Sequence, residues 1–211
     1  MKTKLSKKRA ISTVLTTVII LVSSVVLGSG VVLYGTSLFQ GGTQSEAITV
    51  SGIKVWVHGT DETGLAWGAA KIRNTGDKVV SVDKISIRGA DVPFGNWYAD
   101  TSVNSTTFQQ SLNFTGFSGV NGQTIDDGTC TQTSVLNIDL TGDNIDASTI
   151  CANAATGPIG LDTGASAVIY FQLTNGTLGP LDSGAQTTVN IFAGKAGAPQ
   201  STTVIGTTQG P

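Results

Sequence analysis

The chain has few of the residue types on which several functional classes depend. Its 211 residues include one histidine, one methionine and two cysteines, and only 12% are charged, against ~25% in an ordinary soluble domain. Twelve Lys and Arg against 14 Asp and Glu leave a net charge of −2, so no cationic excess attracts nucleic acid. Glutamate occurs only twice, which argues against a helical bundle. Two cysteines exclude a disulfide-dense miniprotein.

Motifs for catalysis and cofactor binding are also missing. The sequence contains no GxSxG, HExxH, Walker or dinucleotide-binding motif. The single histidine, His58, alternates with apolar residues, which is typical of a surface or structural position. Five loop aspartates lack the spacing of a calcium-binding loop and predict a solvated acidic face: Asp126, Asp127, Asp139, Asp143 and Asp146. We therefore expect neither enzymatic activity, nor a cofactor, nor a metal site.

The charges that are present are distributed unevenly. Five of the twelve bases precede residue 10, and residues 10–45 contain no charged side chain. All 14 acids follow, together with the seven remaining bases, so the chain beyond residue 10 has a net charge of −7. A basic leader, an uncharged stretch and an acidic remainder predict three parts with different surroundings.

The uncharged stretch is long and apolar. Seventeen of the 29 residues from Ile11 to Phe39 are Ile, Val, Leu, Tyr or Phe, and the rest are Ser, Thr and Gly. As a helix it would be roughly 45 Å long, enough to cross a ~30 Å hydrocarbon core. A helix also satisfies every backbone polar group in lipid. The bases before it favour a cytoplasmic N-terminus, with residues 46–211 outside.

Three interpretations of this segment compete. A secretory signal peptide needs an apolar core of only ~7–15 residues, whereas the apolar run here continues past Gly28-Ser29-Gly30. A permanent single-pass anchor is the second interpretation. In the third, a leader is cut off just before the apolar helix and the helix is kept in the mature protein.

The order of residues at the junction favours the third interpretation. Lys7-Lys8-Arg9-Ala10 is followed directly by Ile11-Ser12-Thr13. A basic cluster, one small residue and then a long apolar helix resembles the N-terminus of archaeal type IV pilin-like proteins and archaellins, which carry a class III, prepilin-type signal peptide. The resemblance covers about residues 7–40.

This resemblance implies that a prepilin peptidase cuts after Ala10, at a site formed by Lys8, Arg9, Ala10 and Ile11. Residues 1–10 would then leave, and residues 11–45 would form the filament-core helix. Alanine before the cut departs from the commoner glycine. Leu15 stands where bacterial type IV pilins carry glutamate, so the resemblance is to the archaeal branch.

Small residues in the helix fit an assembly role. Ser24, Gly28, Gly30 and Gly35 would let helix backbones approach closely, and Ser24-x-x-x-Gly28 matches the small-xxx-small pattern. The alternative is that small residues are simply common in membrane helices. The family implies a homopolymer as the product, a membrane location before assembly, and export by a prepilin peptidase, an assembly ATPase and a platform protein.

From about residue 47 the hydrophobic period changes to that of strands. Ile53, Val55 and Val57 alternate with polar or aromatic neighbours. Strands are also expected at 65–73, 79–89, 167–173, 185–193 and 201–206. Val80 and Val82 share one parity while Ile85 and Ile87 share the other, which predicts a β-bulge near Asp83-Lys84.

Together these features predict an α+β chain, with a long N-terminal hydrophobic α-helix followed by an all-β immunoglobulin-like sandwich over residues 46–211. Residues 69–89 and 167–194 look alike, and we interpret them as two hairpins of this sandwich. Residues 91–164 alternate poorly. They predict a loop-rich insertion with one or two extra strands, forming either a solvated decoration or an adhesive surface.

Two kinds of covalent modification are expected in the outer domain. Cys130 and Cys151 are an even pair in an extracellular segment, which favours a disulfide over two free thiols. Asn104, Asn113 and Asn175 begin N-x-[ST] sequences and are candidates for N-glycosylation.

The sequence therefore predicts a structural subunit, a pilin or an archaellin, of an archaeal type IV pilus-like cell-surface filament for adhesion or motility. A minor pilin that primes or caps the filament fits the same residues. The alternative is a single-pass, membrane-anchored extracellular β-sandwich that acts as a binding module.

Overall fold

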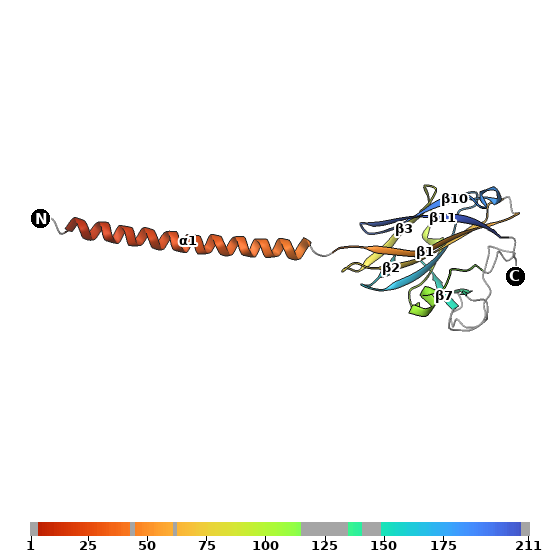
Figure 1. The fold of residues 1–211 in the computed structure, drawn as a ribbon, viewed down its shortest axis with the longest axis horizontal. Helices are drawn as coiled ribbons and strands as arrows, with labels where there is room; N and C mark the ends of the chain where they lie inside the picture. The colour runs from red at the N-terminus through yellow and green to blue at the C-terminus, as the bar shows by residue number, and fades with distance from the viewer. Residues whose placement is uncertain (1–3, 43–44, 61–62, 115–134, 141–148, 208–211) are drawn as a thin grey trace. The chain divides into compact units, whose positions relative to one another are not determined.

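The computed structural model describes residues 4–42, 45–60, 63–114, 135–140 and 149–207. The chain forms two units, Met1–Gln44 and Ser45–Pro211. The first unit contains one helix, α1 (Lys4–Gly42). The second contains the strands (Figure 1). The predicted fold class is confirmed: a long N-terminal apolar helix precedes an all-β sandwich of immunoglobulin-like type.

Six strands of the described chain form the first layer, sheet A. Their order across the sheet is β1 (Ile48–His58), β2 (Ala66–Asn74), β9 (Ser166–Gln172), β5 (Trp97–Asp100), β7 (Thr149–Ala154) and β6 (Val135–Asp139). Each pairs antiparallel with the next.

Sheet B forms the opposing layer. Its order is β4 (Ala90–Asp91), β3 (Val80–Ile87), β10 (Gln186–Ala193) and β11 (Ala196–Thr207), and β8 (Ile159–Leu161) also pairs with β3. β11 joins the layers, because its residues up to Thr203 pair antiparallel with β10 and its residues from Val204 run parallel to β1.

The β-bulge predicted from the parity switch is confirmed. In the pairing of β3 with β10, Phe192 lies opposite Lys84 and Ala193 opposite Val82, so Asp83 has no partner across the sheet. The extra residue reverses the side-chain alternation. Val82 and Ile85 consequently both face the core and are fully buried.

The main core lies between the two sheets. Its largest contributions are from branched and aromatic side chains of β1, β2 and β9 on one layer and of β3 and β10 on the other. Trp97 of β5 is also buried here and donates its indole N–H to the carbonyl oxygen of Val92 at 3.0 Å. Complete burial of such side chains is worth roughly 1.5–3 kcal/mol each, before the entropy cost of folding.

A second, smaller core covers the outer face of sheet A. Trp56, Trp67 and Tyr170 form its floor, with Trp56 and Tyr170 stacked at 6.4 Å between ring centroids. Phe114 stacks on Trp56 at 5.3 Å. Strands β6 and β7 contribute Leu136, Ile138, Ile150 and Ala152 to the same cluster. Sheet A is thus covered on both faces.

The two similar segments do not form hairpins, so that prediction is wrong. β2 and β3 belong to different sheets, as do β9 and β10. Instead the segments pair with each other, β2 with β9 in sheet A and β3 with β10 in sheet B. The turns that begin at Asn74 and Asn175 therefore carry the chain from one sheet to the other. Such crossings are needed because both sheets contribute an apolar face to the same core.

The insertion prediction also underestimates the strands in residues 91–164. The described residues of this range contain β5, β6, β7 and β8, besides a short helix α2 (Ser105–Gln109) and a 3₁₀ turn at Phe94–Asn96. Short, interrupted strands of this kind show little alternation in sequence. Strands β5, β6 and β7 extend sheet A, whereas β8 pairs with β3 in sheet B. Strands β6 and β7 supply four of the twelve buried residues of the second core.

The chain enters the sandwich at a fixed point. The carbonyl oxygen of Ala47 accepts hydrogen bonds from Thr75 and Gly76, and that of Ser45 accepts one from Asp77. A Cβ at Gly76 would clash with the Ser45 carbonyl oxygen, so only glycine fits this turn. Buried Asn74 holds the turn from inside, donating to the Leu161 carbonyl oxygen and accepting from Gly76.

Candidate functional site: an exposed apolar helix

Helix α1 is apolar and exposed along most of its length. One span, Ser12–Leu38, is long and apolar enough to cross a membrane, with a mean hydropathy of 2.3 and none of it buried. Fifteen large apolar side chains between Val14 and Leu38 are 53–72% exposed. Exposed apolar area on this scale is rare on a soluble monomer and is typical of a membrane or protein interaction surface.

Five hydroxyl groups of the span bond to the helix's own backbone. Thr16 donates to the carbonyl oxygen of Ser12, and Thr17, Ser24, Ser29 and Thr36 each donate to the carbonyl three residues earlier, at 2.8–3.0 Å. A hydroxyl that bonds its own backbone costs little to transfer into an apolar medium. These residues therefore leave the outer surface of the helix effectively apolar.

The predicted packing residues lie on two faces of α1. At ~100° per residue, Ser24, Gly28 and Gly35 fall within about 40° of one another, whereas Gly30 lies about 140° from their centre. A Cβ built on Gly28, Gly30 or Gly35 meets nothing within 4 Å. The glycines are therefore not required by contacts of this chain with itself, and each lowers intrinsic helix stability by ~1 kcal/mol relative to alanine.

The other predicted site residues are placed as follows. Lys8, Arg9, Ala10 and Ile11 lie within α1, and their side chains fall outside the described residues. Cys151, in β7, is disulfide-bonded. Cys130 lies outside the described residues, as do Asp126, Asp127, Asp143, Asp146 and the side chain of Asp139. No cluster of metal-ligating side chains occurs in the part of the chain that the structure describes.

All three candidate glycosylation asparagines are exposed. Asn104 caps α2, where its side-chain oxygen accepts from the Thr107 N–H at 2.8 Å. Asn113 follows that helix, and Asn175 lies in a turn whose next residue, Gly176, has φ +83°. Exposure is necessary for glycosylation, and the modification itself stays a prediction.

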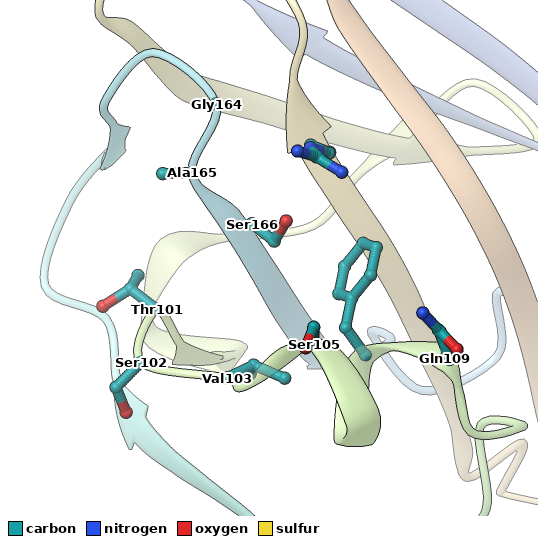
Figure 2. A pocket seen from close by; sticks show the side chains of 10 residues that line it. Thr101, Ser102, Val103, Ser105, Gln109, Gly164, Ala165 and Ser166 are labelled. Atoms are coloured by element: carbon teal, nitrogen blue, oxygen red, sulfur yellow. The ribbon is translucent and has the colours of Figure 1, made fainter.

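A pocket of about 420 Å³ lies on the sandwich (Figure 2). Ser105 and Gln109 of α2 face Gly164, Ala165 and Ser166 across it. The remaining lining residues are Thr101, Ser102, Val103, Phe108 and Arg73. The lining comes from three chain segments more than 25 residues apart, which is why no local sequence motif predicts the pocket.

Lysines from sheet A secure the wall of this pocket. The Lys71 ammonium donates to the carbonyl oxygens of Phe108 and Gln110 at 2.9 and 2.7 Å, and Lys54 donates to that of Leu112 at 2.8 Å. Burial, and secondarily the positive charge of Lys54, lowers the pKa of Lys71. Neither lysine has a carboxylate partner among the described residues, where the ion pairs are Lys84–Asp91 and Arg88–Asp182.

No protein-family model matches this chain, and no curated protein matches its sequence. Its function therefore has to be inferred from its own residues.

Proposed function

We propose that this protein is a structural subunit of an archaeal type IV pilus-like filament on the cell surface, polymerising through α1. The observation that carries the proposal is the exposed apolar span Ser12–Leu38, none of which is buried. In the membrane, lipid solvates this surface. After extraction, the surface can be kept from water only by apolar partners, and copies of the same helix supply them.

The positions of the small residues support a polymer rather than a simple dimer. A helix dimer of the small-xxx-small type needs one close-approach stripe. Helix α1 has such a stripe at Ser24, Gly28 and Gly35, and a further glycine on another face at Gly30. Two faces allow close contacts with more than one neighbour, as a helical bundle of many subunits requires.

Electrostatics supports removal of the leader before assembly. Lys4, Lys7, Lys8 and Arg9 lie in the first turns of α1. In a membrane they remain at the cytoplasmic surface. In a bundle of identical helices they would be brought together without acidic partners, since residues 10–45 carry no charge, and burying unpaired charges is costly. Cleavage after Ala10 removes all the leader's side-chain charges and leaves only the new α-amino group of Ile11 at that end of the helix.

The sandwich would form the outer sheath of the filament. Beyond residue 10 the net charge is −7, which favours solubility of a crowded surface. In this proposal the precursor sits in the membrane with its N-terminus in the cytoplasm, and a prepilin peptidase, an assembly ATPase and a platform protein carry out export. The filament serves adhesion or motility.

The test combines shearing of cells with analysis of the subunit's N-terminus. Filaments sheared from the surface should contain this chain beginning at Ile11. The variant Ala10→Leu should retain Met1 and yield no filaments, whereas the control Ser6→Leu, which adds similar bulk inside the leader, should assemble normally. Membrane-bound monomer that retains Met1 in wild-type cells would contradict the proposal and favour the single-pass anchored binding module.

A further inference from the structure

The pocket beside α2 presents polar groups that have no partner within the described part of the chain. The hydroxyls of Thr101, Ser105 and Ser166 and the amide of Gln109 line it and make no hydrogen bond there. Hydroxyls and amides both donate and accept. Such a set matches the hydroxyl groups of a sugar, each of which also donates and accepts. The volume of about 420 Å³ is in the range of small-molecule sites.

Arg73 gives the pocket a charge preference. Its guanidinium lines the pocket and forms neither an ion pair nor a hydrogen bond with any described residue. A guanidinium offers paired N–H donors that fit a carboxylate in a bidentate arrangement. An unpaired arginine at a concave surface therefore favours an anionic ligand with two coplanar oxygens.

The surroundings reinforce this preference. Lys71 lies on the same strand two residues from Arg73, and its ammonium is 5.7 Å from the centroid of the Phe108 ring that lines the pocket. Two acids lie near the lining. Asp162, two residues before Gly164, is exposed and forms no ion pair with Arg73. Asp100 accepts hydrogen bonds from the N–H and hydroxyl of Ser102 and from the N–H of Cys151. The Asp100 carboxylate is buried and engaged by three donors, whereas Arg73 is exposed.

We propose that this pocket binds a hexuronic acid, a sugar whose ring carries a carboxylate. Arg73 holds the carboxylate, and the hydroxyls and Gln109 hold the ring hydroxyls. Phe108 offers its face to the C–H groups of the sugar ring. The free sugar and an acidic polysaccharide that contains it both present these groups, so either can be the source of the ligand.

Sugar binding at this pocket is independent of filament assembly. Every lining residue belongs to Ser45–Pro211 of one chain. Loss of sugar binding would leave the assembly proposal intact, and failure of assembly would leave the pocket unchanged.

The experiment titrates the purified full chain, held in a zwitterionic detergent without a sugar headgroup, and follows binding by calorimetry. The probes are sodium glucuronate, glucose as the neutral sugar, acetate as the carboxylate without a ring, and an oligoglucuronate to separate polymer from free sugar. Glucuronate should bind at least ~10-fold more tightly than glucose, the scale of one charge-assisted bidentate contact. It should also bind more tightly than acetate, which has the carboxylate but lacks the ring hydroxyls. Tighter binding of the oligomer identifies a polysaccharide as the ligand source, and equal binding identifies the free sugar.

Two variants localise the effect. Arg73→Gln should weaken glucuronate binding by about tenfold or more and remove its advantage over glucose. Lys195→Gln removes an exposed cation outside the pocket and should change neither. Because the Arg73 side chain has no described partner, the variant should melt at the wild-type temperature. Arg73→Lys, which keeps the charge but loses the paired donors, should show intermediate affinity.

Three results would each overturn the inference: no saturable binding of glucuronate or its oligomer to the wild-type chain, equal affinity for glucuronate and glucose, or undiminished glucuronate binding by Arg73→Gln.

Discussion

Replacement of Gly28 by leucine separates assembly from membrane insertion. A Cβ at Gly28 meets nothing within 4 Å in the isolated chain, so the larger side chain causes no clash inside the subunit. Leucine also raises intrinsic helix stability by up to ~1 kcal/mol and makes the span more apolar. Expression, helix formation and membrane insertion should therefore be retained.

Assembly should be affected, because leucine fills the stripe through which neighbouring helices approach. Overpacking of a tight apolar contact costs about 1–3 kcal/mol. The gain in helix propensity applies equally in the membrane and in the filament, so it does not offset this cost. The subunit concentration needed for polymerisation should rise between about fivefold and about 150-fold. Gly28→Ala, which adds one methyl group, should have a smaller effect in the same direction.

The assay compares filament mass in the sheared fraction with subunit in the membrane fraction. Val22→Leu is the matched control: it also enlarges an apolar side chain that is half exposed, but it lies about 140° from the stripe centre. Wild-type filament yield from Gly28→Leu, or an equal loss of yield from Val22→Leu, would refute the packing role of the stripe.

Two further predictions concern the sandwich. The buried Tyr170 hydroxyl donates to the carbonyl oxygen of Asn113 at 2.7 Å. Tyr170→Phe, which keeps the ring, should therefore lower the free energy of unfolding by about 1–2 kcal/mol and the melting temperature by ~2–8 °C. An unchanged melting temperature would show that this bond contributes nothing. Hydrogen bonds from the Gly179 N–H and then from Arg88 lower the pKa of the Asp182 carboxyl from its ordinary value of 3.8. The ionised carboxylate therefore stabilises the folded sandwich above pH 3.8, and this stabilisation is lost as the pH falls through the lower, folded-state pKa. Asp182→Asn should reduce this loss of stability in acid melts, whereas an identical acid limb in both proteins would contradict the assignment.

Local sequence patterns predicted the elements that depend only on residues close together in the chain. The charge-free run over residues 10–45 predicted the apolar helix, since length and hydropathy alone decide such a span. The parity switch between Val82 and Ile85 predicted the bulge at Asp83, because one extra residue must reverse the alternation.

Features that depend on distant pairing could not be predicted in this way. Trp56 alternates with Val55 and Val57, and a period of two suggests that it faces solvent. It is instead 5% exposed beneath Phe114, because sheet B covers one face of sheet A and segments far along the chain cover the other, on which Trp56 lies. The pocket around Arg73 could not be predicted for the same reason, since its residues meet only after β2, α2 and β9 are assembled.

Electron microscopy of the native filaments at side-chain resolution tests the central claim most directly. We predict a core made only of copies of the apolar helix, beginning at Ile11, with neighbouring backbones in close approach at Gly28 and the sandwich on the outside. A core built from the sandwich, or filaments that retain residues 1–10, would contradict the proposal.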